Sequence, residues 1–445
     1  MKFIANIFDL KNHLGIPVNE NEVIKTISID TRTIKRHALF IAIKGKNFDG
    51  NNFVDDAISK GANIVIADQY RYRDCKNKKI IYVKDTITAL RKISKSIIKQ
   101  YKGNVIAITG SNGKTSTTDI IFKTLKNSSK TIKNYNNEIG LPLSIMNASK
   151  KSNNLVFEIG ASKFKDISYL SSILKPHIGI ITNIGHSHLE ALKNIEGVFK
   201  VKSEIVRNIR KNGFLIVPGD NKDHLKRWKK IRTDINLITF GGDIASDFYP
   251  TNIKSKSNEL SFSIESHLIK KPVKVKTSLE GEHNIKNIIA AFAVHYCLKQ
   301  DLEIFSKKLN SQKFNLRQTR SKWIRGSILI DDSYNANPDS TKKSIDLLSK
   351  SNKNTILLLG DMLELGRFKN KLHREIGEYA KIKGINHLLG YGNLTKETVK
   401  SFGKGGLFFR DKEELKDYLK KNIKSKDIVL IKGSRGMKME RFINV

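Results

Sequence analysis

Cysteine, tryptophan and acidic residues are scarce in this chain of 445 residues. It has two cysteines, Cys75 and Cys297, two tryptophans, and 43 Asp and Glu against 81 Lys and Arg. Two cysteines cannot build a disulfide framework and match no metal-ligand spacing, so a reducing cytoplasm is the expected location. No apolar run approaches the ~20 residues of a membrane span, and the first residues show no signal-peptide cleavage pattern. We therefore expect a protein that is neither exported nor anchored in a membrane.

The shortage of acidic residues leaves a formal net charge of +38. Such an excess raises nucleic-acid binding as a possible function, because Lys and Arg neutralise phosphates. The lysines are scattered through every region together with abundant Asn and Ile, however, and no stripe of Arg interleaved with aromatic residues stands out. A general compositional bias explains this distribution. We therefore expect no nucleic-acid partner, although the charge favours a polyanionic substrate.

Apolar runs alternate with helical patterns along most of the chain, which is typical of α/β folds. At ~150 residues per domain the length suggests about three domains, and we place them at 1–83, 84–312 and 313–445. The expected architecture is a small N-terminal α/β domain, a central domain with a parallel sheet of the P-loop ATPase kind, and a C-terminal Rossmann-like α/β domain. Near-continuous apolar strands such as 177–185 favour sheets that are buried on both faces.

The segment VIAITGSNGKTSTTDII (105–121) places two glycines, a lysine and two hydroxyls between a predicted strand and a predicted helix. Gly110 and Gly113 allow the backbone to approach an anion, and the N–H groups at the start of the helix point toward it. Lys114 adds a positive charge and Thr115 a metal-binding oxygen. The general phosphate-loop pattern has a further glycine two residues before Gly110, and this chain lacks it. The segment still predicts a nucleoside triphosphate site, and hence the use of ATP.

Polar side chains follow several other predicted strands of the central domain. Glu158 ends the strand LVFEI, where it is placed to join the loop threonine in an oxygen site of the kind that magnesium prefers. A solvated glutamate at a strand end fits the spacing equally well. His186 and His188 follow another strand, but no cysteine or third histidine nearby completes a zinc site. Lys200 and Lys202 lie on the next predicted helix, where the spacing alone favours a solvated face.

The C-terminal domain also has polar residues at its predicted strand ends. They occur in DDSYNANPDS (331–340), which includes Asp332, and in GDMLELGRFKNKLH (360–373), which includes Asp361 and Glu364. Ligands bind at this edge of open α/β sheets. Asn, Asp, Gly and Pro are also ordinary turn and cap residues, so the residues alone leave both interpretations open.

Several motifs, in order along nearly the whole chain, resemble those of the Mur ligase family of ATP-dependent amide-forming enzymes. The family's phosphate loop is similar to TGSNGKTST (109–117), including the absent glycine. The further matching motifs are NNEIGLPLS (136–144), EIGAS (158–162), TNIGHSHLE (182–190), KVKSEI (200–205), GEHNIKNIIAA (281–291) and KGSRGMKMERF (432–442). DDSYNANPDS and LLGDMLELG resemble the MurF type, which adds D-alanyl-D-alanine to UDP-MurNAc-tripeptide. The Asp-Asn-Pro-Arg motif of the diamino-acid-adding type and the N-terminal G-x-G-x-x-G of another type are absent.

The resemblance implies a role for each matching residue. The residues implied to bind the ATP phosphates are Gly110, Ser111, Asn112, Gly113, Lys114, Thr115 and Ser116. Those implied to contact the rest of ATP are Asn284, Asn287, Arg317 and Asp332. Two Mg2+ ions are implied, with Thr115, Glu158, His188 and a carbamylated Lys202 as the metal-binding residues. Lys114, His188 and Lys202 are the implied catalytic residues.

In the N-terminal domain, SIDTRT (28–33) and IKGKNFDGNNF (43–53) resemble the family block that recognises the UDP-sugar. The implied contacts are Thr31, Arg32, Lys44 and Gly45. The implied reaction proceeds through an acyl phosphate, which the amine of D-Ala-D-Ala then attacks, in a monomeric enzyme. The motifs do not tell whether the third residue of the tripeptide is meso-diaminopimelate or lysine.

Three other interpretations compete with this one. Another Mur-type or folylpolyglutamate-synthase-like ligase would share the phosphate loop but need a different acceptor, against which NANPDS and GDMLELG argue. A P-loop ATPase that binds nucleic acid would explain the net charge, and would show salt-sensitive binding to DNA or RNA. An inactive member of the family is disfavoured by the presence of Lys114, Thr115, Glu158, His188 and Lys202.

Overall fold

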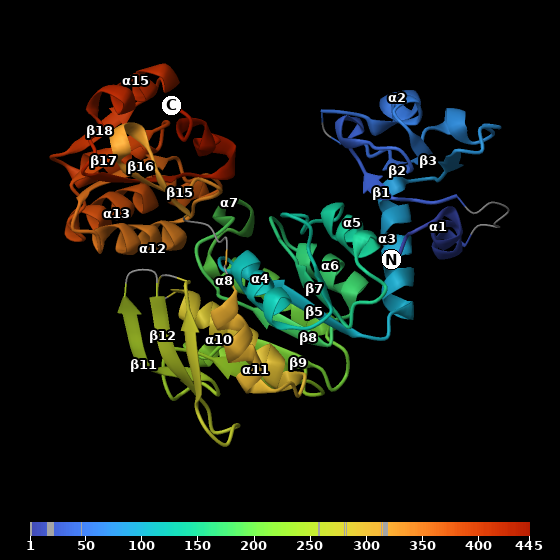
Figure 1. Ribbon diagram of the computed structural model, residues 1–445, viewed down its shortest axis with the longest axis horizontal. Helices are drawn as coiled ribbons and strands as arrows, with labels where there is room; N and C mark the ends of the chain where they lie inside the picture. Colours follow the sequence, from blue (N-terminus) through green and yellow to red (C-terminus); the bar gives the residue numbers. More distant parts are fainter. Residues whose placement is uncertain are drawn as a thin grey trace.

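Three α/β bodies follow one another along the chain in the computed structural model (Figure 1). The structure describes residues 2–15, 22–45, 47–256, 259–279, 281, 283–312, 314 and 319–445. The N-terminal body, blue in Figure 1, and the C-terminal body, orange to red, lie apart from each other above the central body. This arrangement confirms the predicted fold class of three α/β domains. The predicted boundaries at residues 83 and 312 stay predictions.

The N-terminal body is a parallel sheet of four strands in the order β1-β2-β3-β4. The strands are β1 (Thr26–Ser28), β2 (Ala38–Ile41), β3 (Ala62–Ala67) and β4 (Ile80–Tyr82), and the helices are α1 (Ile7–Leu14) and α2 (Val54–Ser59). A longer helix, α3 (Thr86–Gln100), leads from this body into the central one (Figure 1). Asp85 caps α3 by accepting a hydrogen bond from the backbone N of Thr88, which satisfies one of the free N–H groups of its first turn.

The central body contains a six-stranded, all-parallel sheet in the order β10-β9-β8-β5-β7-β6. The strands are β5 (Asn104–Thr109), β6 (Ser128–Lys130), β7 (Asn154–Glu158), β8 (Ile178–Ile181), β9 (Phe214–Pro218) and β10 (Asn236–Phe240). The helices are α4 (Lys114–Thr124), α5 (Gly140–Asn147), α6 (Asp166–Leu174), α7 (Leu189–Leu192), α8 (Ile195–Ser203), α9 (Lys222–Ile231), α10 (His283–Cys297) and α11 (Leu302–Ser311).

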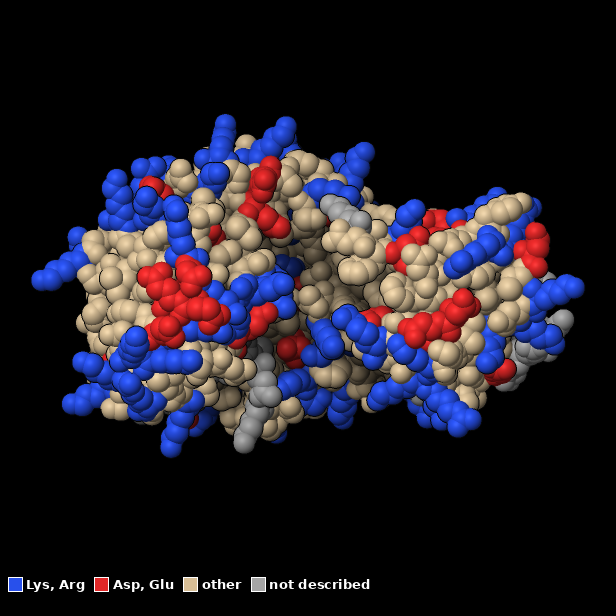
Figure 2. Space-filling view, turned by 90° about the horizontal axis from the view of Figure 1, so that it is seen from above, with Lys and Arg blue, Asp and Glu red and all other residues tan. Residues whose placement is uncertain are grey.

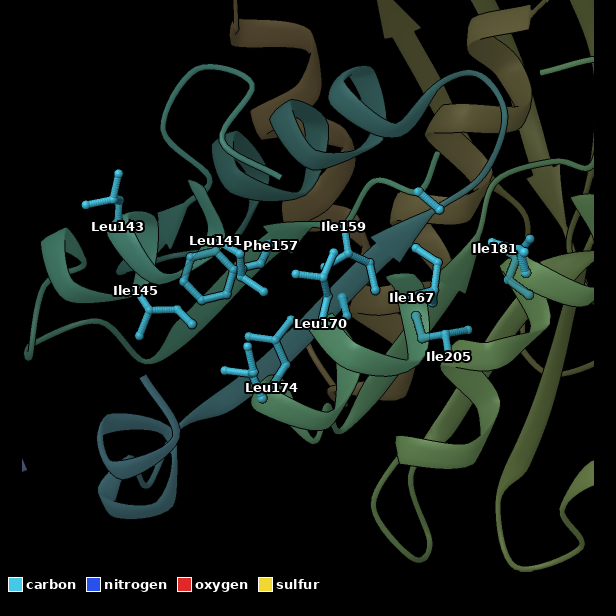
Figure 3. Packing of buried hydrophobic residues seen from close by; sticks show 14 of the residues in the cluster. Leu141, Leu143, Ile145, Phe157, Ile159, Ile167, Leu170, Leu174, Ile181 and Ile205 are labelled. Carbon is cyan, nitrogen blue, oxygen red and sulfur yellow. The ribbon is translucent and has the colours of Figure 1, made fainter. Parts of the chain in front are cut away.

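Helices cover both faces of this sheet, as its continuous apolar strands predicted. Side chains alternate between the faces of a strand, so Val105 and Ala107 of β5 join one hydrophobic cluster while Ile106 and Ile108 join another. The first cluster includes residues of α5, α6 and β7, which Figure 3 shows packed together. The second includes residues of α4, α10 and α11. The phosphate loop thus begins at the end of a strand that is fixed from both sides.

A separate antiparallel sheet of three strands precedes α10. Its strands are β11 (Tyr249–Lys256), β12 (Glu259–Glu265) and β13 (Val273–Thr277), in that order. They fall within the stretch 246–278 that the sequence predicted to be rich in strands. Buried side chains of β12 and β13 belong to the same hydrophobic cluster as α10, so this sheet extends the core behind the phosphate loop.

The C-terminal body is a second six-stranded sheet in the order β14-β15-β19-β16-β17-β18, in which only β14 runs antiparallel to its neighbour. The strands are β14 (Thr319–Lys322), β15 (Ile328–Asp332), β16 (Asn354–Gly360), β17 (His387–Tyr391), β18 (Gly406–Phe409) and β19 (Asp427–Lys432). The helices are α12 (Pro338–Ser349), α13 (Lys369–Ile382), α14 (Thr395–Phe402) and α15 (Lys412–Asn422). Within the described part of the chain, no helix has both the length and the apolar character needed to cross a bilayer.

Candidate active site

The predicted phosphate loop is the turn between β5 and α4. Gly110 and Gly113 have φ angles of +143° and +80°, a backbone conformation that favours glycine. A Cβ atom on Gly113 would lie 2.4 Å from Oδ1 of Asn287, so no larger side chain fits there without a shift. Nζ of Lys114 donates to the backbone oxygen of Gly110 at 2.8 Å. The loop therefore curls around the lysine, and the first N–H groups of α4 face the same space.

Glu158 and Thr115 meet beside this loop, as the sequence predicted. Oγ1 of Thr115 donates to Oε2 of Glu158 at 2.8 Å, and Nδ2 of Asn136 donates to Oε1 at 2.8 Å. β7 pairs with β5, which brings the end of one strand beside the end of the other. Glu158 is 4% exposed, so its carboxylate is fixed in place rather than solvated. Asn136 was not among the predicted site residues.

These oxygens fit a magnesium ion by their chemistry. Mg2+ takes oxygen ligands, and in phosphate-binding enzymes one or two protein groups serve it together with substrate phosphates and waters. One buried carboxylate and one hydroxyl next to a phosphate loop match that requirement. Across the described residues, no group of three or more His, Cys, Asp or Glu side chains is arranged as a metal cluster.

Asn284 and Asn287, on the first turns of α10, support the loop from behind. Oγ1 of Thr117 donates to Oδ1 of Asn287 at 3.4 Å, and Nδ2 of Asn287 donates to Oδ1 of Asn284 at 3.2 Å. Both asparagines are buried but line the same cavity as the loop. On the other side, the backbone N of Asn112 donates to Oδ1 of Asn183 at 2.9 Å, a contact that the sequence analysis missed.

The C-terminal body contacts the central body through the start of α12. Asn337, the N-cap of α12, exchanges two side-chain hydrogen bonds with Asn112 of the phosphate loop, at 2.8 and 3.3 Å. Two residues on, Asp339 accepts from the backbone N of His186 at 2.7 Å and contacts its Nδ1 at 3.1 Å. The hydrogen bond that Asp339 accepts from the imidazole raises the pKa of His186 despite burial. His186 thus takes part in joining the two bodies.

His188 also faces the C-terminal body. Its Nδ1 lies 2.5 Å from Oε2 of Glu364, and the backbone N of Glu190 donates to the backbone oxygen of Glu364 at 2.9 Å. Contact with His188 lowers the pKa of Glu364. The imidazole is held through one nitrogen, which leaves the other available as a ligand.

Lys202 is buried on α8, at 1% exposure, whereas Lys200 is exposed. The expectation that both lie on a solvated face was therefore wrong for Lys202. Burial, and next the positive charge of Lys114, lower the pKa of Lys202 to about 7, against the opposing effects of nearby carboxylates. No described residue forms a hydrogen bond or ion pair with its ammonium. A buried amine without a partner is costly when charged, so this lysine is partly neutral near pH 7.

Asp332, at the end of β15, is paired with a lysine that the sequence analysis did not single out. Its Oδ2 accepts from Nζ of Lys432 at 2.6 Å and from Oγ of Ser344 at 2.6 Å. Lys432 also donates to the backbone oxygen of Asn335 at 3.0 Å. Both charged side chains are buried, and the adjacent strands β15 and β19 bring them together.

A cavity of about 1050 Å³ lies between the two bodies. Figure 2, seen from above, shows a hollow near the middle of the molecule, with the C-terminal body on its left, the N-terminal body on its right, and Lys and Arg on both sides. The predicted residues that line the cavity are Ser111, Asn112, Gly113, Lys114, Thr115, Ser116, Glu158, His188, Asn284, Asn287 and Asp332. The structure therefore brings most of the predicted ATP and metal residues to one place.

Other predicted residues do not line this cavity. Thr31 and Arg32 lie in the short 3-10 helix η1 (Thr31–Thr33) of the N-terminal body, where Arg32 forms an ion pair with Asp30 at 2.7 Å. Lys44 and Gly45 belong to an exposed turn of the same body. Gly110 and Lys202 are not among the residues that line the cavity. Arg317 falls outside the described residues.

Comparison with known proteins explains this arrangement. Three family models match: the Mur ligase family catalytic domain over residues 23–100, the Mur ligase middle domain over 108–295, and the Mur ligase glutamate ligase domain over 318–435. The UDP-N-acetylmuramoyl-tripeptide–D-alanyl-D-alanine ligase of Buchnera aphidicola subsp. Baizongia pistaciae is 37% identical over 424 residues, covering 94% of this chain and 91% of that protein. The chain belongs to the Mur ligase family. The resemblance inferred from its motifs is thereby confirmed.

Other Mur ligases are similar over their whole length. The Bacillus subtilis protein with the same name is 33% identical over 452 residues, covering 99% of this chain and 97% of its own. The crystal structure of MurF from Acinetobacter baumannii matches with a TM-score of 0.86 at 28% identity, over 98% of this chain and 97% of that one. MurF from Thermotoga maritima in complex with ADP matches with a TM-score of 0.81 at 28% identity, over 94% and 96%.

Proposed function

We propose that this Mur ligase uses ATP to join D-alanyl-D-alanine to UDP-N-acetylmuramoyl-tripeptide, giving UDP-MurNAc-pentapeptide, ADP and phosphate for peptidoglycan synthesis. The observation that carries the proposal is the cavity where the phosphate loop, Glu158 and the NANPDS and GDMLELG loops meet. The full-length similarity to ligases of this name supports it. We further propose that the enzyme is a cytoplasmic monomer and acts on these small molecules rather than on nucleic acid.

The first step is attack of the terminal carboxylate of the tripeptide on the γ-phosphate of ATP, which gives an acyl phosphate and ADP. Both reactants are anions, so positive charge at the loop is needed to bring them together. Lys114 and the N–H groups of α4 supply it, and Asn284 and Asn287 keep the loop in shape. The amine of D-Ala-D-Ala then attacks the activated carbonyl, and phosphate leaves.

Thr115 and Glu158 would hold the magnesium ion of this site, with Asn136 fixing the second oxygen of the carboxylate. When bound, the ion neutralises charge on the phosphates. His188 is the proposed ligand of a second ion, because the C-terminal body holds only one of its ring nitrogens. Water would hydrolyse an acyl phosphate, so the approach of Asn337 to the phosphate loop and of Asp339 to His186 also serves to shield it.

Lys202 is the proposed site of carbamylation. Its neutral amine can attack carbon dioxide, forming an N–C bond and releasing a proton, and the product carries a negative charge. A pKa of about 7 leaves a substantial neutral fraction at physiological pH, and the adjacent positive charge of Lys114 favours the anionic product. Labelled carbon dioxide followed by carbon NMR would detect the carbamate in the wild type and not in Lys202→Met.

In the N-terminal body, Thr31, Arg32, Lys44 and Gly45 are the proposed contacts for the UDP-sugar. Arg32 is 86% exposed in its side chain, and the guanidinium is held in one orientation by Asp30. An exposed but oriented arginine suits recognition of a phosphate or a polar base.

The deciding experiment measures phosphate release with ATP and Mg2+, supplying UDP-MurNAc-tripeptide and D-Ala-D-Ala separately and together. We expect release only with both substrates, accompanied by the mass of UDP-MurNAc-pentapeptide. Release that is independent of both substrates, or that requires a different amine, would overturn the proposed reaction.

A further inference from the structure

A second, smaller hollow adjoins the active-site cavity where α3, α6 and the 3-10 helix η4 (Glu204–Asn208) meet. It encloses about 370 Å³. Lys165 and Tyr169 line both the hollow and the cavity, so the two spaces are neighbours across these side chains. We call this space the basic hollow, because Arg91, Lys165 and Arg207 line it.

The three cations of the basic hollow have no anionic partner. Within the described chain, none of their charged groups forms an ion pair or a side-chain hydrogen bond. The guanidinium of Arg91 lies over the ring of Tyr169, 5.0 Å from its centre. This cation–π contact holds the guanidinium beside Tyr169 at the wall of the hollow and does not use its N–H donors in an ion pair.

Glu204, the one carboxylate among the described residues that line the hollow, already accepts hydrogen bonds. Glu204 accepts hydrogen bonds from the backbone N of Lys165 at 2.8 Å and from that of Ser168 at 2.9 Å. It thus satisfies the free N–H groups at the start of α6, which is where a carboxylate is most stable. Its two oxygens are committed to the backbone, so it does not neutralise Arg91, Lys165 or Arg207 directly.

The positive charge extends along the neighbouring helices. Burial, followed by the charges of Arg91 and Lys175, lowers the pKa of Lys95 on α3. The protein therefore tolerates repulsion among cations at this junction. Asp85 and Glu138 act electrostatically on Tyr169, but they do not line the hollow. Lysines scattered over the surface, as in Figure 2, are solvated and need no ligand. In the basic hollow, by contrast, three cations without an ion-pair partner among the described residues surround one concavity next to the active-site cavity, which suits an anionic ligand.

We propose that the basic hollow binds an anionic arm, a carboxylate or a phosphate, of the UDP-MurNAc-peptide while the terminal carboxylate of the same molecule reaches the phosphate loop. This inference rests on the proposed function. Arginine matches both anions through paired N–H donors. The position suits such a substrate, because α3 connects the N-terminal body to the central one, with Ile87 of α3 lining the cavity and Arg91, one turn further, lining the hollow.

The test compares wild type with Arg207→Gln and Arg91→Gln. Two probes are UDP-MurNAc-tripeptides, one with meso-diaminopimelate and one with lysine as the third residue. The third probe is UDP-MurNAc without a peptide. Affinity is measured by calorimetric titration without ATP, and KM and kcat are measured for the two tripeptides. We expect each variant to weaken binding and raise KM on the order of tenfold, as for a lost charge-assisted hydrogen bond, with kcat and the KM values for ATP and D-Ala-D-Ala unchanged. Arg207→Lys is expected to recover part of the loss.

The control is Lys229→Gln with Lys230→Gln on α9, which removes exposed positive charge elsewhere on the central body. A loss confined to the diaminopimelate probe identifies a side-chain carboxylate as the ligand. A loss shared by all three probes identifies the diphosphate. Unchanged affinity for every probe, or an equal loss in the lysine control, would overturn the proposal. If wild type binds the probes but does not join them to D-Ala-D-Ala, the proposed function fails while the titrations still decide the inference.

Discussion

The central body and the C-terminal body each contain a buried lysine near the end of a helix or strand, and the two lysines differ in whether the amine has a hydrogen-bonding partner. Lys432 in the C-terminal body donates to Asp332 at 2.6 Å and to a backbone oxygen at 3.0 Å. Lys202 in the central body is equally buried and has no hydrogen-bonding partner among the described residues. A buried cation normally requires an anion. The Lys432–Asp332 pair thus stabilises the C-terminal body, whereas the unpaired amine of Lys202 in the central body is suited to a chemical reaction.

The largest effect is expected from Lys202→Met, which removes the lone amine at nearly constant volume. If the lysine has only a chemical role, kcat should fall on the order of 10³-fold, as when a charge-stabilising group is lost from an active site. Stability should not fall, because no partner is left unsatisfied. Turnover and thermal unfolding, measured on the same sample, check both statements.

The pH dependence of this variant sharpens the comparison. The folded pKa of Lys202 is lowered to about 7 from an ordinary 10.5, so the unfolded state binds the extra proton between these values. With Lys202 as the free amine, before carbamylation, wild-type stability therefore rises as pH increases from about 7 toward 10.5, and this gain is gone once pH has fallen to about 7. The stability advantage of Lys202→Met should accordingly be greatest at pH 7 and below. An advantage that is constant with pH would contradict the assignment.

Lys432→Met should instead unfold the C-terminal body more readily. Asp332 would remain buried without its cation, at a cost of about 3 to 5 kcal/mol. Denaturant titration measures the loss, and the added change Asp332→Leu should restore much of it, because the uncompensated charge is then gone. If Lys432→Met alone were as stable as wild type, the structural role of Lys432, and with it the contrast to Lys202, would be contradicted.

Glu158→Gln tests the surroundings of the lone amine. The carboxylate of Glu158 raises the pKa of Lys202, against burial, and it meets Thr115 at the proposed magnesium site. We expect kcat to fall about 10²-fold, comparable to the loss of one charge-stabilising group, with a higher requirement for Mg2+. A titration of activity against Mg2+ provides the measurement, and Glu196→Gln on the exposed side of α8 serves as the matched control.

The smallest effect is expected at the interface between the central and C-terminal bodies, where His186 contacts Asp339. Asp339 raises the pKa of His186 above its ordinary 6.5, and His186 holds that of Asp339 below 3.8. The ion pair therefore exists between these limits and is lost as pH rises through the raised pKa of His186. Both side chains are partly exposed, so its contribution is below about 1 kcal/mol. Scattering or interdomain fluorescence should show slight opening above that pH in wild type, and none in His186→Gln.

Much of the central fold was predictable, because its strands are continuous apolar runs that end in recognisable turns. The phosphate loop was predicted from its residues, whereas the spacing alone left Glu158 open between a magnesium site and a solvated strand end, and the family resemblance favoured the first. Lys200 and Lys202, by contrast, look alike in sequence, and they differ because α8 packs against α6 and buries only Lys202. The spacing of residues along a helix predicts which of them share one face of that helix, but not which other elements pack against that face.

Contacts between bodies were not predictable from the sequence. Asn112 and Asn337 are 225 residues apart, and no local pattern indicates that the start of α12 meets the phosphate loop. For the segment that contains Asn337, a ligand-binding role and a turn or cap role were both left open, and Asn337 is the N-cap of α12. Lys432 was part of a family motif, but its partner could be identified only once β15 and β19 were seen side by side.

The asparagine pair between the two bodies has a consequence for inhibition. Its hydrogen bonds are neutral and contribute about 1 kcal/mol each, so together with the contacts of Asp339 to His186 and of Glu364 to His188 it forms a weak interface between the bodies. A small molecule that bound both the phosphate loop and α12 would stabilise the contact between the central and C-terminal bodies. Such a compound would hold the two bodies in one arrangement. ATP, which uses the same loop, would compete with it, whereas a higher concentration of UDP-MurNAc-tripeptide or D-Ala-D-Ala would not displace it directly.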